Sequence, residues 1–411
     1  MKKFVATLAV LCLAFTGIFS YFQIREKKGA EASDADYEAQ LEAYQKAVAQ
    51  IPTADAASLY ALHPADEAVA SINGMDVTWG EYFQAYYSYA AEVEQYMKTA
   101  VMYYGSAPAW TDIYDEGTGT RYCDIPAKSA ESDLMQKAVI EGYAAANGIE
   151  LNAENRTKVE EKLAEDRVKY CGEEATEEDF REFLAGNYLT EELYRDMIAK
   201  NFLYQQMFTD LYGEDGEKIS DADGVKYLQE NGYSAAEHIL FMTVNRETGE
   251  TVDEDTAKEK LEQAKEISEE LRAIEDDDER LKKLKEYQAE YNEDTGSIAY
   301  PDGYTYTAGT MVAEFENAVN GMQEYEVSEP VKTNYGYHVI MRTPLKADAV
   351  IRYSDAGKAM TAKSMAANDA YGTDLQEYMD TLKIEYKNGW KAPVLTDFLK
   401  ETEEKEADLV K

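Results

Sequence analysis

Apolar residues recur at helical spacing over much of the first half of the chain. The first such stretch predicts a helix over 34–49, which Pro52 ends. The stretches that predict further helices run from about Ser129 to Asn147, from about Asn152 to Cys171, briefly after Thr176, briefly after Thr190, and over about 221–230. Residues 53–66 are predicted to be a loop or a short turn of helix, and the Gly-, Pro- and Asp-rich stretch 104–128 is predicted to be a long loop.

A hairpin interrupts this helical pattern early in the chain. Residues 69–77 contain an Asn73-Gly74 pair between β-forming residues, which predicts a two-residue hairpin turn. Thr78 and Glu81 then have the spacing of a capping box that opens a helix. The aromatic residues of that helix are Tyr82, Phe83, Tyr86, Tyr87 and Tyr89.

The periodicity changes at Ala235. Residues 235–243 alternate as a strand does, and a charged amphipathic helix follows. The later predicted segments are a helix over about 279–290, a Gly- and Tyr-rich loop over 295–308, a short helix over 311–319 and a strand over 331–342. This order predicts a small α+β domain whose first and last strands each carry one histidine, His238 and His338. Residues 346–411 are predicted to be mainly helical and to end in an acidic tail.

Composition limits the classes of function. The chain has 411 residues, of which 45% are hydrophobic, so two or three packed domains are expected. Its 81 acidic and 41 basic residues give a formal net charge of −40. Such a surface repels phosphate backbones and anionic lipid, which argues against nucleic-acid binding. It suits a protein that binds basic or unfolded partners, although solubility alone also explains most of the charge.

The N-terminus has the pattern of an export signal or a single membrane anchor. Lys2 and Lys3 precede an uncharged run from Phe4 to Phe22. No small-x-small cleavage site follows this run, which favours an uncleaved anchor. Cys12 is disfavoured as a lipidation site, because the bulky Leu11 precedes it.

The remaining cysteines and the histidines leave few options for other chemistry. Cys123 and Cys171 either pair outside the cell or stay free, because spacing cannot determine their geometry. The three histidines of the chain form no group with cysteine that would suit zinc, and no H-E-x-x-H motif occurs. A metal hydrolase is therefore disfavoured, and no cofactor is expected.

Four segments within residues 234–345 resemble the parvulin family of peptidyl-prolyl isomerases. They are Ala236–Leu240 (AEHIL), Leu284–Asp294 (LKEYQAEYNED), Gly309–Ala318 (GTMVAEFENA) and Val327–Ile340 (VSEPVKTNYGYHVI). The last segment is long and specific, and the others support it through their order and spacing. The resemblance implies a domain with an antiparallel sheet flanked by helices.

The resemblance also implies which side chains form the site. The residues at catalytic positions are His238, Asp294, Thr333 and His338, and those at substrate-binding positions are Met311, Val312, Phe315 and Tyr335. The histidines would face each other below an apolar proline pocket, joined by hydrogen bonds to the aspartate and the threonine. Without the resemblance, a histidine in a strand would be structural, and a Met–Phe pair four residues apart would be core.

The chain departs from the parvulin pattern beside this site. Asn292 replaces the usual serine, and the usual Gly-Gly-x-Leu-Gly stretch is absent, with Ser297–Tyr306 in its place. Tyr325 stands where a glycine is common. These changes leave the main polar group intact, and they affect the expected catalytic rate more than the fold.

The N-terminal half resembles the helical chaperone region of SurA/PrsA-like exported foldases. The hairpin, the capped helix and the helices that lead into the parvulin strand share the order of that region. In such proteins both chain ends build the chaperone region. The expected segments are 1–28 as signal or anchor, 34–233 as helical chaperone domain, 234–345 as isomerase domain, and 346–411, including Trp390, as a helical segment packed on the N-terminal domain.

Two functions follow from these expectations. In the first, the protein isomerises X-Pro bonds and assists folding of unfolded or partly folded exported proteins. It is then held at the outer face of a bacterial membrane through its N-terminal segment or released beyond that membrane. In the second, it is a holdase that binds unfolded exported proteins and whose isomerase domain is catalytically weak or inactive. The sequence leaves its oligomeric state, a dimer included, open.

Overall fold

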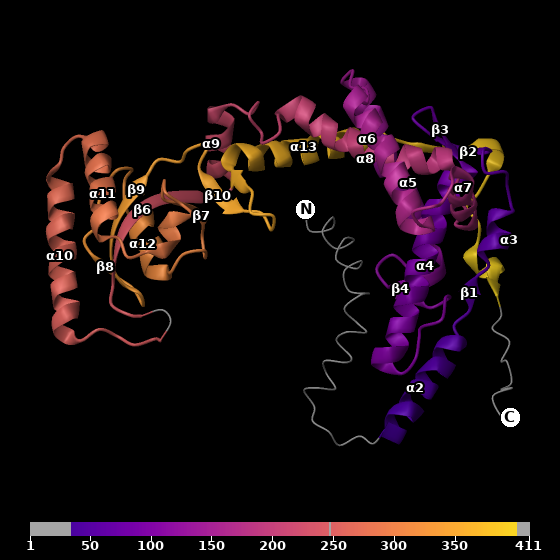
Figure 1. Ribbon diagram of the computed structural model, residues 1–411, viewed down its shortest axis with the longest axis horizontal. Helices are drawn as coiled ribbons and strands as arrows, with labels where there is room; N and C mark the ends of the chain where they lie inside the picture. Colours follow the sequence, from indigo (N-terminus) through magenta and orange to yellow (C-terminus); the bar gives the residue numbers. More distant parts are fainter. Residues whose placement is uncertain (1–33, 246–247, 401–411) are drawn as a thin grey trace. The chain divides into compact units, whose positions relative to one another are not determined.

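The computed structural model describes residues 34–245 and 248–400, which form two compact units (Figure 1). The first unit contains the described residues up to 204 and those from 375 onward, and the second contains 205–374. The predicted export segment Phe4–Phe22, with Cys12, and the acidic tail after 400 lie outside the described residues. None of the described helices is both long enough and apolar enough to cross a membrane.

The first unit is mainly helical and has short strands at its edges. Its elements before residue 205 are α2 (Asp34–Ala49), β1 (Thr53–Ala54), α3 (Ala56–Tyr60), β2 (Ala68–Ile72), β3 (Met75–Thr78), α4 (Trp79–Tyr104), β4 (Ile113–Asp115), β5 (Thr120–Arg121), η1 (Tyr122–Asp124), α5 (Ile125–Ala146), α6 (Ala153–Cys171), α7 (Glu177–Gly186) and most of α8 (Glu191–Tyr212). Its elements after residue 374 are the end of α13 (Ala362–Thr381), β12 (Ile384–Tyr386), η3 (Lys387–Gly389), η4 (Leu395–Phe398) and β13 (Leu399–Lys400).

Local sequence explains how the hairpin and the long helix α4 begin. Asn73 and Gly74 have φ angles of 49° and 85°, as a type I′ turn requires, and β2 pairs with β3. The Thr78 hydroxyl accepts a hydrogen bond from the Glu81 amide, and the Glu81 carboxylate accepts one from the Thr78 amide. The predicted capping box is therefore confirmed. The capped start of α4 directly follows the hairpin and therefore places the aromatic residues of the helix beside it.

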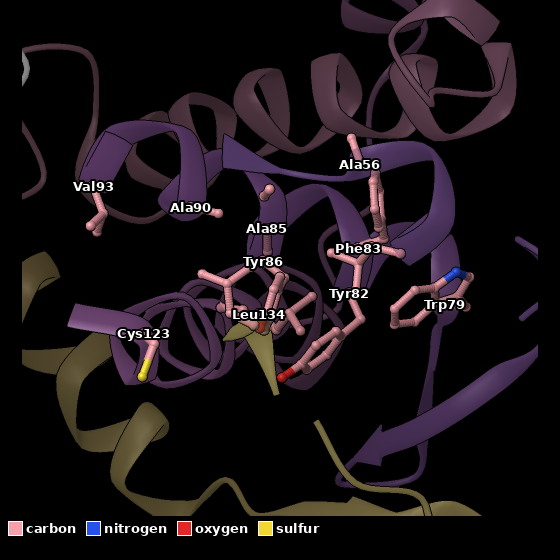
Figure 2. Packing of buried hydrophobic residues seen from close by; sticks show 14 of the residues in the cluster. Ala56, Trp79, Tyr82, Phe83, Ala85, Tyr86, Ala90, Val93, Cys123 and Leu134 are labelled. Carbon is pink, nitrogen blue, oxygen red and sulfur yellow. The ribbon is translucent and has the colours of Figure 1, made fainter. Parts of the chain in front are cut away.

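The core of the first unit is aromatic and includes residues from the end of the chain. Trp79, Tyr82 and Phe83 of α4 are fully buried, and Figure 2 shows them grouped together. The strand β12 pairs with β2, and the Trp390 ring lies 4.7 Å from that of Tyr82. Chain segments more than three hundred positions apart therefore share one core.

His63 packs at the edge of this core. Its ring is half-buried and lies 5.3 Å from Trp79. The indole Nε1 of Trp390 donates to His63 Nε2 at 3.1 Å, and Glu67 lies 3.1 Å from Nδ1. Its contacts with two tryptophans give this histidine a structural role.

The second unit contains a four-stranded antiparallel sheet of order β7-β6-β9-β8. Its elements are α9 (Asp221–Glu230), β6 (Tyr233–Met242), α10 (Glu254–Ala273), α11 (Asp277–Tyr291), η2 (Thr295–Ile298), β7 (Tyr304–Thr307), α12 (Ala313–Asn320), β8 (Val331–Lys332), β9 (Gly336–Thr343), β10 (Val350–Tyr353), β11 (Ala359–Thr361) and most of α13. The predicted α+β fold with a flanked antiparallel sheet is confirmed.

Strand alternation separates the two faces of this sheet. Ile239, Phe241 and Val339 face α10 and α11, which Figure 1 shows beside β6 and β9. Ala236 and Ile340 instead pack with α12. His238 and His338 alternate in step with Ala236 and Ile340, and so they lie on the α12 face.

Several predicted element boundaries were wrong. α5 begins at Ile125 rather than near Ser129, because Pro126 occupies the first turn, where its missing amide hydrogen costs nothing. α8 is 22 residues long rather than short. The strand β7 lies within the predicted loop 295–308, and the C-terminal region contains β10, β11 and β12 in addition to α13. The two described cysteines are free, Cys123 buried and Cys171 half-buried.

Candidate active site

Two histidines meet on the α12 face of the sheet. His238 pairs with Ile340, and His338 pairs with Leu240, so the two imidazoles are diagonal neighbours on adjacent antiparallel strands. Their ring centroids are 5.1 Å apart with an interplanar angle of 53°. Both residues are 5% exposed. The structure therefore places them together, as predicted.

His338 is held by a hydrogen bond from the turn before its own strand. Thr333 Oγ1 and His338 Nε2 are 2.9 Å apart, and the direction of this bond depends on the tautomer of the ring. The amide of Tyr335 donates to the same hydroxyl at 3.1 Å. His338 Nδ1 is buried and has no hydrogen-bond partner among the residues that the structure describes.

Glycine at position 336 makes this turn feasible. Gly336 has a φ of 151°, and a Cβ atom there would lie 2.1 Å from the carbonyl oxygen of Phe241. Any side chain would have to push β6 and β9 apart. The motif therefore requires glycine two residues before His338 for a steric reason.

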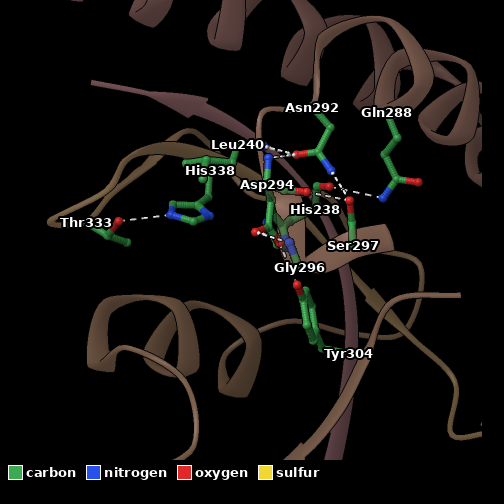
Figure 3. Close-up of polar contacts among 10 residues, drawn as sticks. All are labelled: His238, Leu240, Gln288, Asn292, Asp294, Gly296, Ser297, Tyr304, Thr333 and His338. Carbon is green, nitrogen blue, oxygen red and sulfur yellow. Dashed lines mark hydrogen bonds and ion pairs between the residues drawn. The ribbon is translucent and has the colours of Figure 1, made fainter. Parts of the chain in front are cut away.

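Asp294 approaches the other histidine. Its Oδ2 lies 3.4 Å from His238 Nε2, but the two atoms are not aligned for a hydrogen bond, and Nε2 has no such partner among the described residues. The carboxylate instead accepts from the Tyr304 hydroxyl at 2.6 Å and from the Gly296 amide at 3.0 Å (Figure 3). The expected hydrogen bond between His238 and Asp294 is therefore absent, because two other donors orient the carboxylate.

Asn292 positions the segment that carries Asp294. Its Oδ1 accepts from the amide of Leu240 at 2.9 Å and from the amide of Asp294 at 3.2 Å. The amide of Glu293 donates to the Leu240 carbonyl at 3.0 Å. This segment is therefore hydrogen-bonded to the part of the β6 edge that β7 does not cover. Asn292, which replaces the usual serine, makes one of these hydrogen bonds.

The apolar part of the site comes from the start of α12. Phe315 is 1% exposed, and its ring lies edge-on to both imidazoles, at 5.3 Å from His238 and 5.7 Å from His338. Met311 and Val312 are half-buried in the same cluster. Tyr335 is also half-buried but lies in the turn before β9, outside this cluster. Three of the four expected substrate-binding residues therefore come together.

A cavity of about 190 Å³ lies beside His238, on the side of α11. Its lining residues are His238, Gln288, Ala289, Asn292, Ser297, Tyr300, Pro301, Gly303 and Tyr304. None of the four expected substrate-binding residues lines it. Gln288 and Tyr304 did not stand out in the sequence, and Asn292 was noted only as a departure from the parvulin pattern. For Tyr304 there was a usable pattern, because Tyr304 and Tyr306 are spaced by two residues, as in a strand.

Burial keeps both imidazoles neutral. It lowers the pKa of His238 to about 4, against a smaller opposing effect of the Asp294 carboxylate. Burial, together with the neighbouring His238, lowers the pKa of His338 to about 3. At neutral pH the site therefore consists of two uncharged rings beside one carboxylate. Among residues 34–245 and 248–400, no group of three or more His, Cys, Asp or Glu side chains could hold a metal ion.

These pKa values predict how the folded protein responds to acid. We expect the NMR resonances of His238 and His338 to stay unchanged from pH 8 to about pH 5. The unfolded chain protonates its histidines near pH 6.5, so it binds more protons than the folded chain between about pH 6.5 and 4. The free energy of unfolding should therefore fall as pH decreases through this window.

His63→Gln identifies the third histidine in the spectra and serves as the control variant. Because this residue lies in the other unit, its loss should leave the resonances of His238 and His338 in place. Midpoints near pH 6.5 for His238 and His338 would contradict the buried, neutral pair.

Comparison with known proteins gives the following matches. Residues 238–344 match the PPIC-type PPIase domain of the Rotamase family. Foldase protein PrsA 1 of Bacillus cereus is 47% identical over 66 residues, which cover 16% of this chain and 23% of that protein. Foldase protein PrsA of Caldanaerobacter subterraneus is 26% identical over 330 residues, which cover 77% of this chain and 84% of that protein.

Coverage of several relatives is limited. The match to Chaperone SurA of Burkholderia lata is 29% identical over 104 residues and spans 23% of that protein. The alignment with the crystal structure of PrsA from Bacillus subtilis covers 79% of this chain and 96% of the PrsA chain, at 20% identity and a TM-score of 0.22. The family model matches residues 238–344, which include both His238 and His338.

Proposed function

Since the chain is a SurA/PrsA-like protein with a parvulin-type peptidyl-prolyl isomerase domain, we propose that it isomerises X-Pro bonds in exported proteins and assists their folding. The observation that carries the proposal is the pair of buried imidazoles 5.1 Å apart, bordered by Phe315 and by an oriented Asp294 carboxylate. In this proposal 234–345 is the isomerase part.

The proposed chemistry requires neither a nucleophile nor a cofactor. Rotation about an X-Pro bond is slow because the amide loses double-bond character, with a barrier of about 18–20 kcal/mol. A site accelerates it by binding the twisted amide more tightly than the planar one. Met311, Val312 and Phe315 would hold the proline ring, with Tyr335 at the edge of the site. His238, His338, Thr333 and Asp294 would provide a fixed polar environment for the rotating carbonyl.

We further propose that the helical part of the chain, 34–233 with the C-terminal segment, binds unfolded clients. An export signal or anchor at the N-terminus would place the protein outside the cytoplasm, at the membrane or released from it. The relatives named PrsA and SurA are described as foldases and chaperones, which supports this assignment. The net charge of −40 suits basic or unfolded clients better than nucleic acid.

The deciding experiment is a cis/trans assay on a proline tetrapeptide with the full chain. We expect relaxation faster than the uncatalysed rate and proportional to protein concentration. A rate equal to the uncatalysed one would refute the isomerase proposal. If the same protein then suppressed aggregation of an unfolded client, the alternative function, an inactive holdase, would be supported.

A further inference from the structure

Tyr304 makes the shortest of the hydrogen bonds that orient the Asp294 carboxylate. Its hydroxyl donates to Oδ2 at 2.6 Å, whereas the amide of Gly296 donates to Oδ1 at 3.0 Å. Oδ2 is also the atom that lies 3.4 Å from Nε2 of His238. Tyr304 therefore fixes the carboxylate oxygen nearest the imidazole (Figure 3).

The ring of Tyr304 also covers the imidazole of His238. The two rings are nearly parallel, with an interplanar angle of 16° and centroids 5.7 Å apart. Phe315 lies edge-on to the same imidazole, at 81°. Together with His338, these contacts leave the His238 side chain only 4% exposed. Tyr304 is thus one of the residues that exclude water from the His238 imidazole.

Both contacts act on the electrostatics of the site. A hydrogen bond to an ionised carboxylate is shorter and stronger than one between neutral groups, so it restricts the orientation of Asp294. Exclusion of water around His238 strengthens the interaction of the ring with that carboxylate. Without Tyr304, the Asp294 carboxylate would keep the hydrogen bond from the Gly296 amide, but its other oxygen would be free to rotate toward solvent.

We propose that Tyr304 is a positioning residue of the isomerase, which fixes Asp294 through its hydroxyl and His238 through its ring. The role rests on the proposed function, and it goes beyond the site residues implied by the parvulin resemblance. Tyr304 lies in Ser297–Tyr306, the stretch that stands where the usual glycine-rich segment is absent. The chain therefore builds this part of the site with a residue of its own.

Two substitutions separate the hydroxyl from the ring. We expect Tyr304→Phe to lower kcat for a proline tetrapeptide about tenfold with KM unchanged, because one hydrogen bond to a charged group is lost. The NMR resonances of His238 should shift as the carboxylate moves. Tyr304→Leu removes the ring as well and should shift them further. Tyr337→Phe is the matched control, because Tyr337 lies in the same sheet on the face of α10 and α11.

The outcomes distinguish this inference from the proposed function. An inactive wild-type chain would refute both. An active wild type with unchanged kcat and unchanged His238 resonances in Tyr304→Phe would overturn the positioning role alone. A raised KM at unchanged kcat would also overturn it, because the tyrosine would then bind substrate. Loss of kcat in Tyr304→Phe but not in Tyr337→Phe, with shifted His238 resonances, supports the role.

Discussion

Replacement of Asp294 with alanine is expected to lower kcat/KM for a proline tetrapeptide about a hundredfold, the usual cost of losing one oriented electrostatic group from an active site. Asp294 is the only carboxylate that forms an ion-pair contact with either site histidine among the described residues. Both imidazoles are neutral at pH 7, so this carboxylate supplies the fixed charge of the site.

The substitution also acts on the surrounding segment. The Asp294 side chain caps the short helix η2 by accepting a hydrogen bond from the Gly296 amide. It also accepts a hydrogen bond from the Tyr304 hydroxyl. Alanine removes these bonds together with the charge. Asp294→Asn separates the two effects, because its carbonyl can still accept one of the donors. If charge is what matters, Asp294→Asn should lose nearly as much activity as Asp294→Ala.

Asp302→Ala provides the matched control. Asp302 is an exposed carboxylate in the same loop, eight positions further along. Its loss should leave kcat/KM within a factor of two, as is usual for exposed substitutions. Circular dichroism must show that the Asp294 variants remain folded. Full activity in folded Asp294→Ala would rule out a catalytic role for this carboxylate.

The elements that the sequence predicted are those with strong local patterns. The Asn73-Gly74 turn and the Thr78 capping box depend on residues within a few positions of each other. The strands β6 and β9 have clear alternation, which assigns each histidine to one face of its strand. The proximity of the two rings then follows from the antiparallel register.

The elements that were missed depend on distant partners. β7 is short and exists because Tyr233–Ala236 of β6 pairs with it. β12 likewise requires β2, more than three hundred positions away in the chain. Tyr304 was overlooked for the same reason: in a loop its hydroxyl has no defined direction, whereas in β7 it reaches Asp294. Local propensity cannot predict pairing of this kind.

The second large effect concerns the stability of the first unit, which is mainly helical and is called the helical unit below. We expect Trp79→Ala to lower the free energy of unfolding of this unit by about 3–5 kcal/mol, the usual cost of removing a large aromatic side chain from a core. Trp79 is the first residue of α4, directly after the hairpin, and it is fully buried. Its indole donates to the Tyr60 carbonyl at 2.8 Å, and its ring lies 5.8 Å from Phe83 and 6.2 Å from Trp390.

The positions of the tryptophans allow this loss to be measured in one unit alone. All three tryptophans of the chain, Trp79, Trp110 and Trp390, lie in the helical unit. Fluorescence during urea unfolding therefore reports on that unit, and in Trp79→Ala the other two tryptophans still report. Isomerase activity at each urea concentration reports on the unit that carries His238 and Asp294.

The expected result is a lower urea midpoint by fluorescence with little change in the midpoint of activity. Each unit has its own hydrophobic cores, and a cavity in one core does not remove contacts from another. Tyr104→Ala is the control, because this residue at the end of α4 is 80% exposed and should shift neither midpoint. An equal drop in both midpoints would show that the two units unfold as one cooperative structure, since loss of the first core would then remove the isomerase site as well.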